Sequence, residues 1–228
     1  MPDHLILDIV VVLGPLILAI TIHEYAHVAM AKWLGDDLGE RMGRLTLDPL
    51  KHIDPIWTVL LPLVLIVMSS TGGGSSLPFF AAGKPAPYNP NGLTRRFRGK
   101  RISLRYAELL VAIAGPLSNI VVAALLLFLL GMAIRLSVVD TLDGPIVHVL
   151  TSFVQLNIAL FVFNLIPIPP LDGSKVLVAF LPSQAAMRFE EIASSASMFV
   201  LILIVVGGGR VLGGAVAGIW DVLVQLVF

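Results

Sequence analysis

The sequence of 228 residues contains no cysteine and has few charged residues. Without cysteine the chain can form neither a disulfide nor a thiolate metal site, so a metal would have to be held by His, Asp or Glu. Charged residues make up only 13% of the chain and hydrophobic residues 57%, and the mean hydropathy is +0.94. Soluble domains carry roughly 25% charged residues. This composition excludes an ordinary soluble protein and indicates an integral membrane protein embedded in a lipid bilayer.

Long polar stretches are missing as well. No polar segment is long enough to fold by itself, so we expect a single membrane-embedded unit over residues 1–228. The first apolar segment has no basic region before it and no small-residue cleavage site after it. We therefore expect it to be a retained membrane span rather than a signal peptide.

Acidic residues are absent from residues 95–105, which contain six Lys and Arg. Basic residues also follow the first apolar segment, at Lys32, Arg41, Arg44 and Lys51. Loops rich in Lys and Arg are retained in the cytoplasm during membrane insertion. We therefore expect a multi-pass protein of the cell membrane with both basic segments on the cytoplasmic side. We interpret the basic cluster as a topology signal and expect no nucleic acid as a partner.

Three apolar runs are long enough to cross a bilayer, which takes about 20 residues as a helix. They are residues 5–34, 106–134 and 145–166. Near the C-terminus, residues 192–206 and 211–228 are apolar on either side of GGGR, which favours a tilted span with an interfacial tail over a helical hairpin. The sequence thus predicts an all-α polytopic membrane protein with about four to six transmembrane helices.

Residues 56–70 form an apolar run that is too short for a normal crossing. As a helix they would cover about 22 Å, against about 30 Å for the hydrocarbon core. An even number of crossings must separate the two basic loops, and TGGGSS at residues 71–76 is a flexible turn. We therefore predict a re-entrant hairpin over residues 56–82, beside a water-filled cavity. Short membrane-associated strands near residues 45–48 and 84–88 are expected around a buried metal site.

Two histidines and a glutamate interrupt the first apolar run in the motif HEYAH, residues 23–27. His23 and His27 are four residues apart, so they lie on one helical face and can bind the same ion. Glu24 beside them can act as the base for an attacking water, the arrangement of HExxH zinc hydrolases. An ionisable group at the centre of a transmembrane helix costs roughly 2.5 to 3.5 kcal/mol, which favours a function over a chance match. The motif predicts a Zn²⁺ site.

A third protein ligand is expected, because catalytic zinc usually has three protein ligands and one open position. The candidates are His52, His148 and Asp172. His148 is predicted at the non-cytoplasmic end of its span. Asp172 follows three prolines that end a helix and can carry the carboxylate inward. Spacing favours Asp172 only slightly over His52, so on the residues alone both remain candidates.

Five motifs occur in one order between residues 10 and 180: HEYAH, GRLTLDPLKHIDP, GKPAPYNP, AGPLSN and NLIPIPPLDG. In this combination the chain resembles the site-2 protease family of intramembrane zinc metalloproteases. Within that family it is similar to the small prokaryotic members that carry neither a PDZ nor a CBS domain. The resemblance implies one Zn²⁺ per chain, bound by His23, His27 and Asp172, with Glu24 activating the water.

The resemblance also implies roles for residues around the metal. It suggests that Asn164 holds the substrate carbonyl or its oxyanion, and that Gly115, Pro116 and Asn119 shape the span between the two metal-bearing ones. Close packing is the favoured interpretation of Gly115 and Pro116. A buried Asn119 needs hydrogen-bonding partners. Asn157 shares a helical face with Asn164, and we favour interhelical hydrogen bonding for it.

The predicted function is hydrolysis of peptide bonds within or near transmembrane helices of membrane-protein or peptide substrates, as in regulated intramembrane proteolysis. The active site is expected near the cytoplasmic side. One alternative is a membrane metal-binding protein or transporter, which would need ionisable groups staged across the bilayer. Another is a zinc hydrolase of lipid amides, which would need a lateral lipid pocket. The sequence carries no signal for an oligomeric state.

Overall fold

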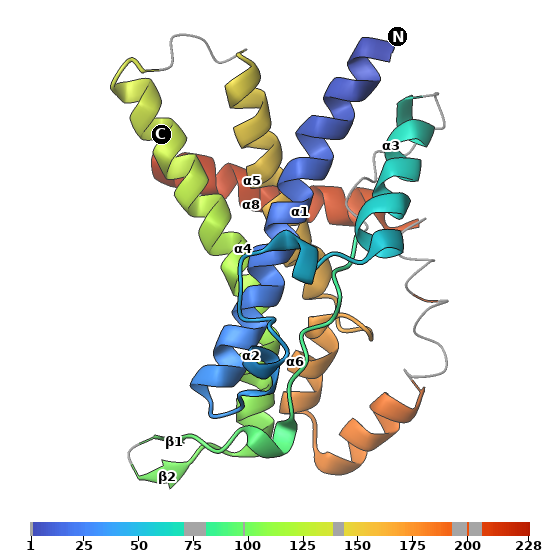
Figure 1. The fold of residues 1–228 in the computed structure, drawn as a ribbon, viewed down its shortest axis with the longest axis vertical. Coiled ribbons are helices and arrows are strands. Elements are labelled where there is room, and N and C mark those ends of the chain that lie inside the picture. Colours follow the sequence, from blue (N-terminus) through green and yellow to red (C-terminus); the bar gives the residue numbers. More distant parts are fainter. Residues whose placement is uncertain (1, 71–80, 98, 139–143, 193–199, 201–206) are drawn as a thin grey trace.

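A computed structural model describes residues 2–70, 81–97, 99–138, 144–192, 200 and 207–228 (Figure 1). Its α-helices are α1 (Pro2–Trp33), α2 (Leu38–Arg41), α3 (Leu61–Ser70), α4 (Leu104–Arg135), α5 (Pro145–Asn164), α6 (Asp172–Phe180), α8 (Gly209–Val227) and a further helix over residues 183–192. Short helical turns are η1 (Pro49–Lys51), η2 (Pro55–Leu60) and η3 (Pro90–Gly92). The strands described are β1 (Arg96–Phe97) and β2 (Lys100–Arg101). The predicted all-α class is confirmed.

Helices α1, α4 and α5 form the central bundle (Figure 1). α1 and α5 run in one direction and α4 in the other, and all three are long and apolar enough to cross a membrane. Two core clusters hold them together, one of Leu16, Ala19, Ile20, Ala81, Leu156 and Leu160 and one of Ala31, Leu34, Leu93, Ala107 and Val111. The alanines let the helices approach closely, as in other membrane bundles. The three predicted spans are confirmed as helices.

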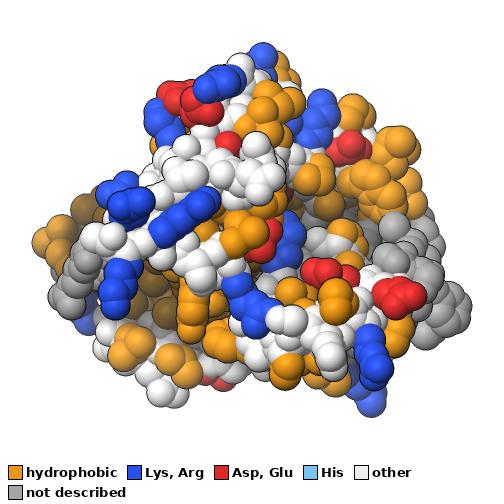
Figure 2. All heavy atoms as spheres, turned by 90° about the horizontal axis from the view of Figure 1, so that it is seen from below, with side chains coloured by type: hydrophobic (Ala, Val, Ile, Leu, Met, Phe, Trp, Pro, Cys, Tyr) orange, Lys and Arg blue, Asp and Glu red, His pale blue; other side chains and the backbone are white. Residues whose placement is uncertain are grey.

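The end of α1 and the start of α4 lie at the same end of the bundle, together with the β1–β2 hairpin (Figure 1). Nη1 of Arg95 donates to the carbonyl oxygen of Trp33 at 2.7 Å, and its main-chain N–H donates to that of Leu34 at 2.8 Å. Lys and Arg side chains gather on this face of the molecule (Figure 2). We call it the basic end. Lys32 at the end of α1 and Arg41 in α2 lie at the same end as residues 95–97 and 99–101 (Figure 1). The chain therefore leaves this end and returns to it between them, which agrees with the predicted even number of membrane crossings.

The segment between these two basic loops leaves and returns at one place. Asp54 caps η2, its Oδ1 accepting the main-chain N–H of Trp57 at 3.0 Å, and α3 continues from η2. Ala82 then donates its main-chain N–H to the Trp57 carbonyl at 3.3 Å, and Thr58 Oγ1 donates to the Ala82 carbonyl at 2.6 Å. The two ends of the predicted hairpin therefore lie side by side. Its predicted turn, residues 71–76, and most of its predicted returning arm lie outside the described residues.

The prediction of strands around the metal site is wrong for the described residues. Residues 45–48 and 84–88 have no ladder partner, and the strands that are described lie at the basic end. Pro85 and Pro87 carry no N–H, so this part of the chain cannot donate the regular hydrogen bonds of a ladder. Residues 82–86 are held instead by single hydrogen bonds to neighbouring parts of the chain. We call residues 82–86 the wall segment.

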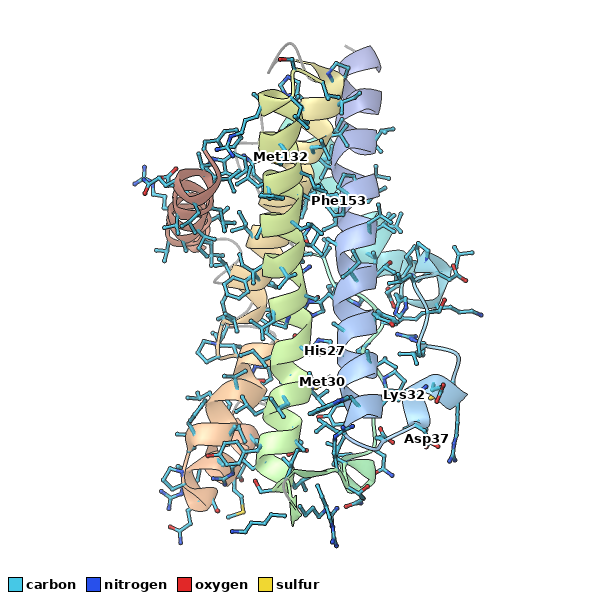
Figure 3. All side chains as sticks on the ribbon, turned by 90° about the vertical axis from the view of Figure 1, so that its left-hand side faces the viewer. His27, Met30, Lys32, Asp37, Met132 and Phe153 are labelled. Carbon is cyan, nitrogen blue, oxygen red and sulfur yellow. The ribbon has the colours of Figure 1, made fainter. Side chains whose placement is uncertain are left out.

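Helix α8 is also long and apolar enough to cross a membrane, which makes four such helices among the described residues. It lies across the bundle rather than along it (Figures 1 and 3). Its apolar side packs on α4 and α5, with Val216, Ile219 and Leu223 in the cluster of Ala123 and Ile158. The span predicted over residues 192–206 lies almost entirely outside the described residues.

Candidate active site

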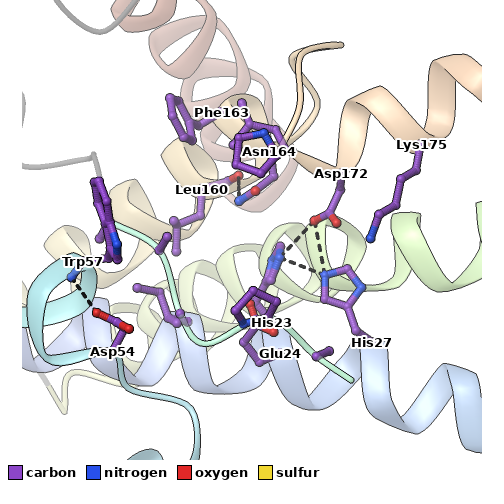
Figure 4. A pocket seen from close by; sticks show the side chains of 18 of the residues that line it. His23, Glu24, His27, Asp54, Trp57, Leu160, Phe163, Asn164, Asp172 and Lys175 are labelled. Carbon is purple, nitrogen blue, oxygen red and sulfur yellow. Dashed lines mark hydrogen bonds and ion pairs between the residues drawn. The ribbon is translucent and has the colours of Figure 1, made fainter. Parts of the chain in front are cut away.

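The side chains of His23, His27 and Asp172 converge between α1 and the start of α6 (Figure 4). The two Nε2 atoms are 3.0 Å apart, and Oδ2 of Asp172 lies 3.1 Å from that of His23 and 3.2 Å from that of His27. All three residues are buried. Asp172 is therefore the candidate third ligand that the structure brings to the histidine pair.

Asp172 reaches this place because α6 begins directly against the end of α5. Three prolines, Pro167, Pro169 and Pro170, prevent α5 from continuing. Gly173 then lies on the main chain of Leu165, where the Cβ of any other residue would overlap the carbonyl group. The motif LDG thus carries the carboxylate inward on a tight turn.

The outer nitrogen of each imidazole has a fixed acceptor. Nδ1 of His23 lies 2.7 Å from Oδ1 of Asn119, and Nδ1 of His27 lies 2.7 Å from the main-chain oxygen of Val111. Because both partners accept, each Nδ1 donates a proton, and in a neutral imidazole this leaves the lone pair on Nε2. Two lone pairs and a carboxylate then face one another. Such a set is stable around a cation, so these residues fit a zinc ion.

The amide of Asn119 is itself held in one orientation. Its Nδ2 donates to the main-chain oxygen of Ala19 at 3.2 Å and to Oδ1 of Asn157 at 2.9 Å. Nδ2 of Asn157 donates to the main-chain oxygen of Phe153 at 2.8 Å. This buried network links α1, α4 and α5 and presents only an oxygen to His23. The interhelical role predicted for Asn157 is confirmed.

Gly115 lies on α4 where that helix passes the two imidazoles. A Cβ at this position would overlap the ring of His27 and come within 2.7 Å of Cε1 of His23. Figure 3 shows α1 and α4 side by side, with His27 between them and nearer to Lys32 than to Met132. The close packing predicted for Gly115 is therefore packing against the candidate metal ligands themselves.

Glu24 is buried next to the cluster, and its Oε2 has no hydrogen-bond partner among the described residues. It lines a cavity of about 420 Å³ together with His23, His27 and Asp172 (Figure 4). Apolar residues form much of the wall, among them Ile20, Trp57, Val111, Leu160 and Phe163. A carboxylate with a free oxygen beside a metal-type cluster is where a general base for water would be needed.

The other sequence candidates separate clearly. Asn164 lines the cavity, with its Nδ2 donating to the Leu160 carbonyl at 3.0 Å. His52 is buried outside the cluster, with Nε2 at 2.7 Å from the main-chain oxygen of Thr46. His148 is exposed in the first turn of α5, at the other end of the bundle. Neither of these histidines joins the pair.

The cavity residues that were not singled out from the sequence include Trp57, Tyr88 and Lys175. Nζ of Lys175 lies 5.3 Å from the centre of the Tyr88 ring. Burial, followed by the carboxylates of Glu108 and Asp172, raises the pKa of Tyr88 to about 12. A signal for Lys175 was available, because it lies one helical turn after Asp172.

Comparisons with known proteins agree with this site. The model of Peptidase family M50 matches residues 130–206, which include Asn164 and Asp172. The chain is 34% identical over 192 residues to "Putative zinc metalloprotease YwhC" of Bacillus subtilis (strain 168), a match that covers 83% of this chain and 78% of that protein. No solved structure gives a significant match.

A second relative carries a similar name. The chain is 30% identical over 198 residues to "Putative zinc metalloprotease Rip2" of Mycobacterium tuberculosis (strain ATCC 25618 / H37Rv), covering 85% of this chain and 66% of that protein. Likeness over most of the chain thus accompanies a buried His, His and Asp cluster and apolar helices of spanning length. The chain belongs to peptidase family M50, the site-2 protease family, and is a membrane zinc metalloprotease with Zn²⁺ as its cofactor.

Proposed function

We propose that the chain hydrolyses peptide bonds within or near transmembrane helices of membrane-protein or peptide substrates, as in regulated intramembrane proteolysis. The observation that carries the proposal is the position of the cavity. It lies among α1, α4 and α5, and Ile20, Leu160 and Phe163 line it beside Glu24. A polar peptide from solution would gain little from such walls, whereas a transmembrane segment brings apolar side chains to cover them.

The residues divide the chemistry among them in this proposal. His23, His27 and Asp172 hold one zinc ion. When bound, zinc polarises the scissile carbonyl and makes water more acidic. Glu24 takes a proton from the attacking water and later gives it to the leaving amine. Asn164 donates from its amide to the substrate carbonyl oxygen or its oxyanion.

The wall segment is the proposed contact for the substrate main chain. Its outer side is occupied, since Ala82 bonds to Trp57 and Thr58 and the Lys84 carbonyl accepts from Nη2 of Arg44 at 2.6 Å. Ala82, Gly83, Pro85 and Ala86 line the cavity, whereas Lys84 does not. A locally unwound substrate can pair with main-chain groups on this inner side, which keeps its carbonyl free of helical hydrogen bonds.

We place the basic end of the bundle in the cytoplasm of the cell, because Lys and Arg gather there. His27 lies in the part of α1 toward that end (Figure 3). The proposed active site is therefore near the cytoplasmic side, from which water reaches it.

The test compares wild type with Glu24→Gln after reconstitution in liposomes with a tagged transmembrane peptide. We expect the variant to keep one zinc ion per chain, measured by mass spectrometry, and to lose at least about 100-fold in cleavage rate, since the base is gone. Glu40→Gln is the matched control, because Glu40 is paired with Lys32 on the surface, away from the cavity. This variant should cleave the peptide at the wild-type rate. Normal cleavage by Glu24→Gln would overturn the mechanism.

The same preparations separate the alternatives. A metal transporter would carry zinc flux that survives in Glu24→Gln, and a lipid-amide hydrolase would release fatty acid while leaving the peptide intact. Either result would overturn the proposed substrate class.

A further inference from the structure

His52 is a buried histidine that the proposed chemistry does not use. Its side chain is completely inaccessible, and Nε2 donates to the main-chain oxygen of Thr46 at 2.7 Å. Nδ1 is buried without a partner in the described part of the chain. Burial lowers the pKa of this imidazole and outweighs the hydrogen bond to Thr46, which raises it, while Arg44 lowers the pKa further and Asp48 raises it. His52 is therefore held as a neutral ring rather than as a charge or a ligand.

The main chain of His52 supports the wall segment. Its carbonyl oxygen accepts the N–H of Lys84 at 2.8 Å. The hydrogen bond from the imidazole to Thr46 thus holds His52 in place, and the main-chain carbonyl of His52 in turn holds Lys84. One side chain connects the loop before η1 to the segment that lines the cavity.

Gly83 lies between His52 and the proposed general base. A Cβ on Gly83 would be 3.2 Å from the His52 oxygen and 3.0 Å from Cγ of Glu24, and closer still to Ile20. The wall segment at Gly83 is therefore closely packed between the His52 carbonyl and α1. We therefore expect a shift of His52 to move Gly83 relative to Glu24.

We propose that His52 is a positioning residue, whose buried imidazole sets the place of the wall segment opposite Glu24. This rests on the proposed function, in which that segment holds the substrate. Thr58 fixes the segment at Ala82 and Arg44 fixes it at the Lys84 carbonyl, and His52 supplies the tie to the Lys84 N–H between them.

Two substitutions test the proposal, and the first readout is independent of activity. His52→Leu removes the donor, whereas Gln in His52→Gln can place an N–H near the position of Nε2. In His52→Leu we expect hydrogen exchange at the amides of Ala82 and Lys84 to be faster by about tenfold, the size of one lost hydrogen bond. Exchange in α4 and α5 should stay as in wild type, and His52→Gln should recover most of the protection.

The second readout is kinetic, with zinc content measured on the same samples. His52→Leu should keep one zinc per chain and raise KM for the transmembrane peptide more than it lowers kcat, with recovery in His52→Gln. His148→Leu, an exposed histidine at the other end of the bundle, should behave as wild type.

Unchanged exchange in His52→Leu would overturn the positioning role, and so would loss of zinc or equal global unfolding in both variants. If the wild type failed to cleave, the proposed function would fall, but the exchange result would still decide whether His52 holds the wall segment.

Discussion

At the scale of single residues, Gly115 makes the sharpest prediction, because its missing side chain leaves room for both imidazoles. In Gly115→Ala the new Cβ would overlap His27 and displace His23. We expect zinc affinity to fall at least about tenfold, the usual effect of disturbing the surroundings of metal ligands, and cleavage to fall with it. Zinc titration by competition with a chelator measures the first effect.

The zinc-free form of Gly115→Ala provides a check on the cause. Alanine is a better helix former than glycine, so α4 should keep its helix content without zinc, as measured by circular dichroism, although the overlap with His27 should lower the melting temperature with and without zinc. Gly14→Ala on α1, where a Cβ meets nothing within 4 Å, is the matched control and should bind zinc normally. Normal zinc affinity in Gly115→Ala would contradict this account of the site.

The sequence predicted some of these residues and not others for a physical reason. His23, Glu24 and His27 follow from the helical period, which is local. The choice between His52 and Asp172 depends on how α6 turns back toward α1, and spacing left it nearly open. Tyr88 meets Lys175 only after the chain has folded, so Tyr88 could not be placed at the cavity from its motif alone.

At the scale of elements, residues 84 and 86 of the wall segment should differ in their contact with the substrate. Ala86 lines the cavity, whereas the Lys84 side chain is exposed elsewhere. A photo-crosslinking amino acid at residue 86 should capture the transmembrane peptide in a Glu24→Gln background, and the same probe at residue 84 should capture much less. Gel analysis of the crosslinked products measures both, and equal capture at the two positions would contradict the proposed contact.

Element lengths were predictable where the bilayer dictates them. α1, α4 and α5 follow from apolar runs, because a helix is the way a single segment satisfies its main chain in lipid. Helix α8 is long and apolar enough to span a membrane, yet it lies across the bundle. Its direction could not be predicted, because length and hydropathy do not determine how a helix is tilted. The strand expected near residues 84–88 does not form because Pro85 and Pro87 lack the N–H donors of a ladder.

At the scale of the whole molecule, the distribution of charge predicts the orientation of the bundle in the membrane. The basic end should face the cytoplasm, and the start of α5 should face the opposite side of the membrane. Since the chain has no cysteine, single cysteines report without background. Lys100→Cys, at the basic end, and His148→Cys, at the other end, are both at exposed positions.

A membrane-impermeant maleimide should label His148→Cys in intact cells and label Lys100→Cys only after the cytoplasmic face is opened. The physical reason is the cost of moving the clustered Arg and Lys of residues 95–105 across the bilayer during insertion. Replacing Arg95, Arg96 and Arg101 with Gln should weaken this orientation preference. Part of the protein should then insert in the opposite orientation, and Lys100→Cys should become labelled in intact cells. If Lys100→Cys were labelled in intact cells with Arg95, Arg96 and Arg101 unchanged, the proposed topology would be wrong. The zinc site would then lie toward the outer face of the membrane.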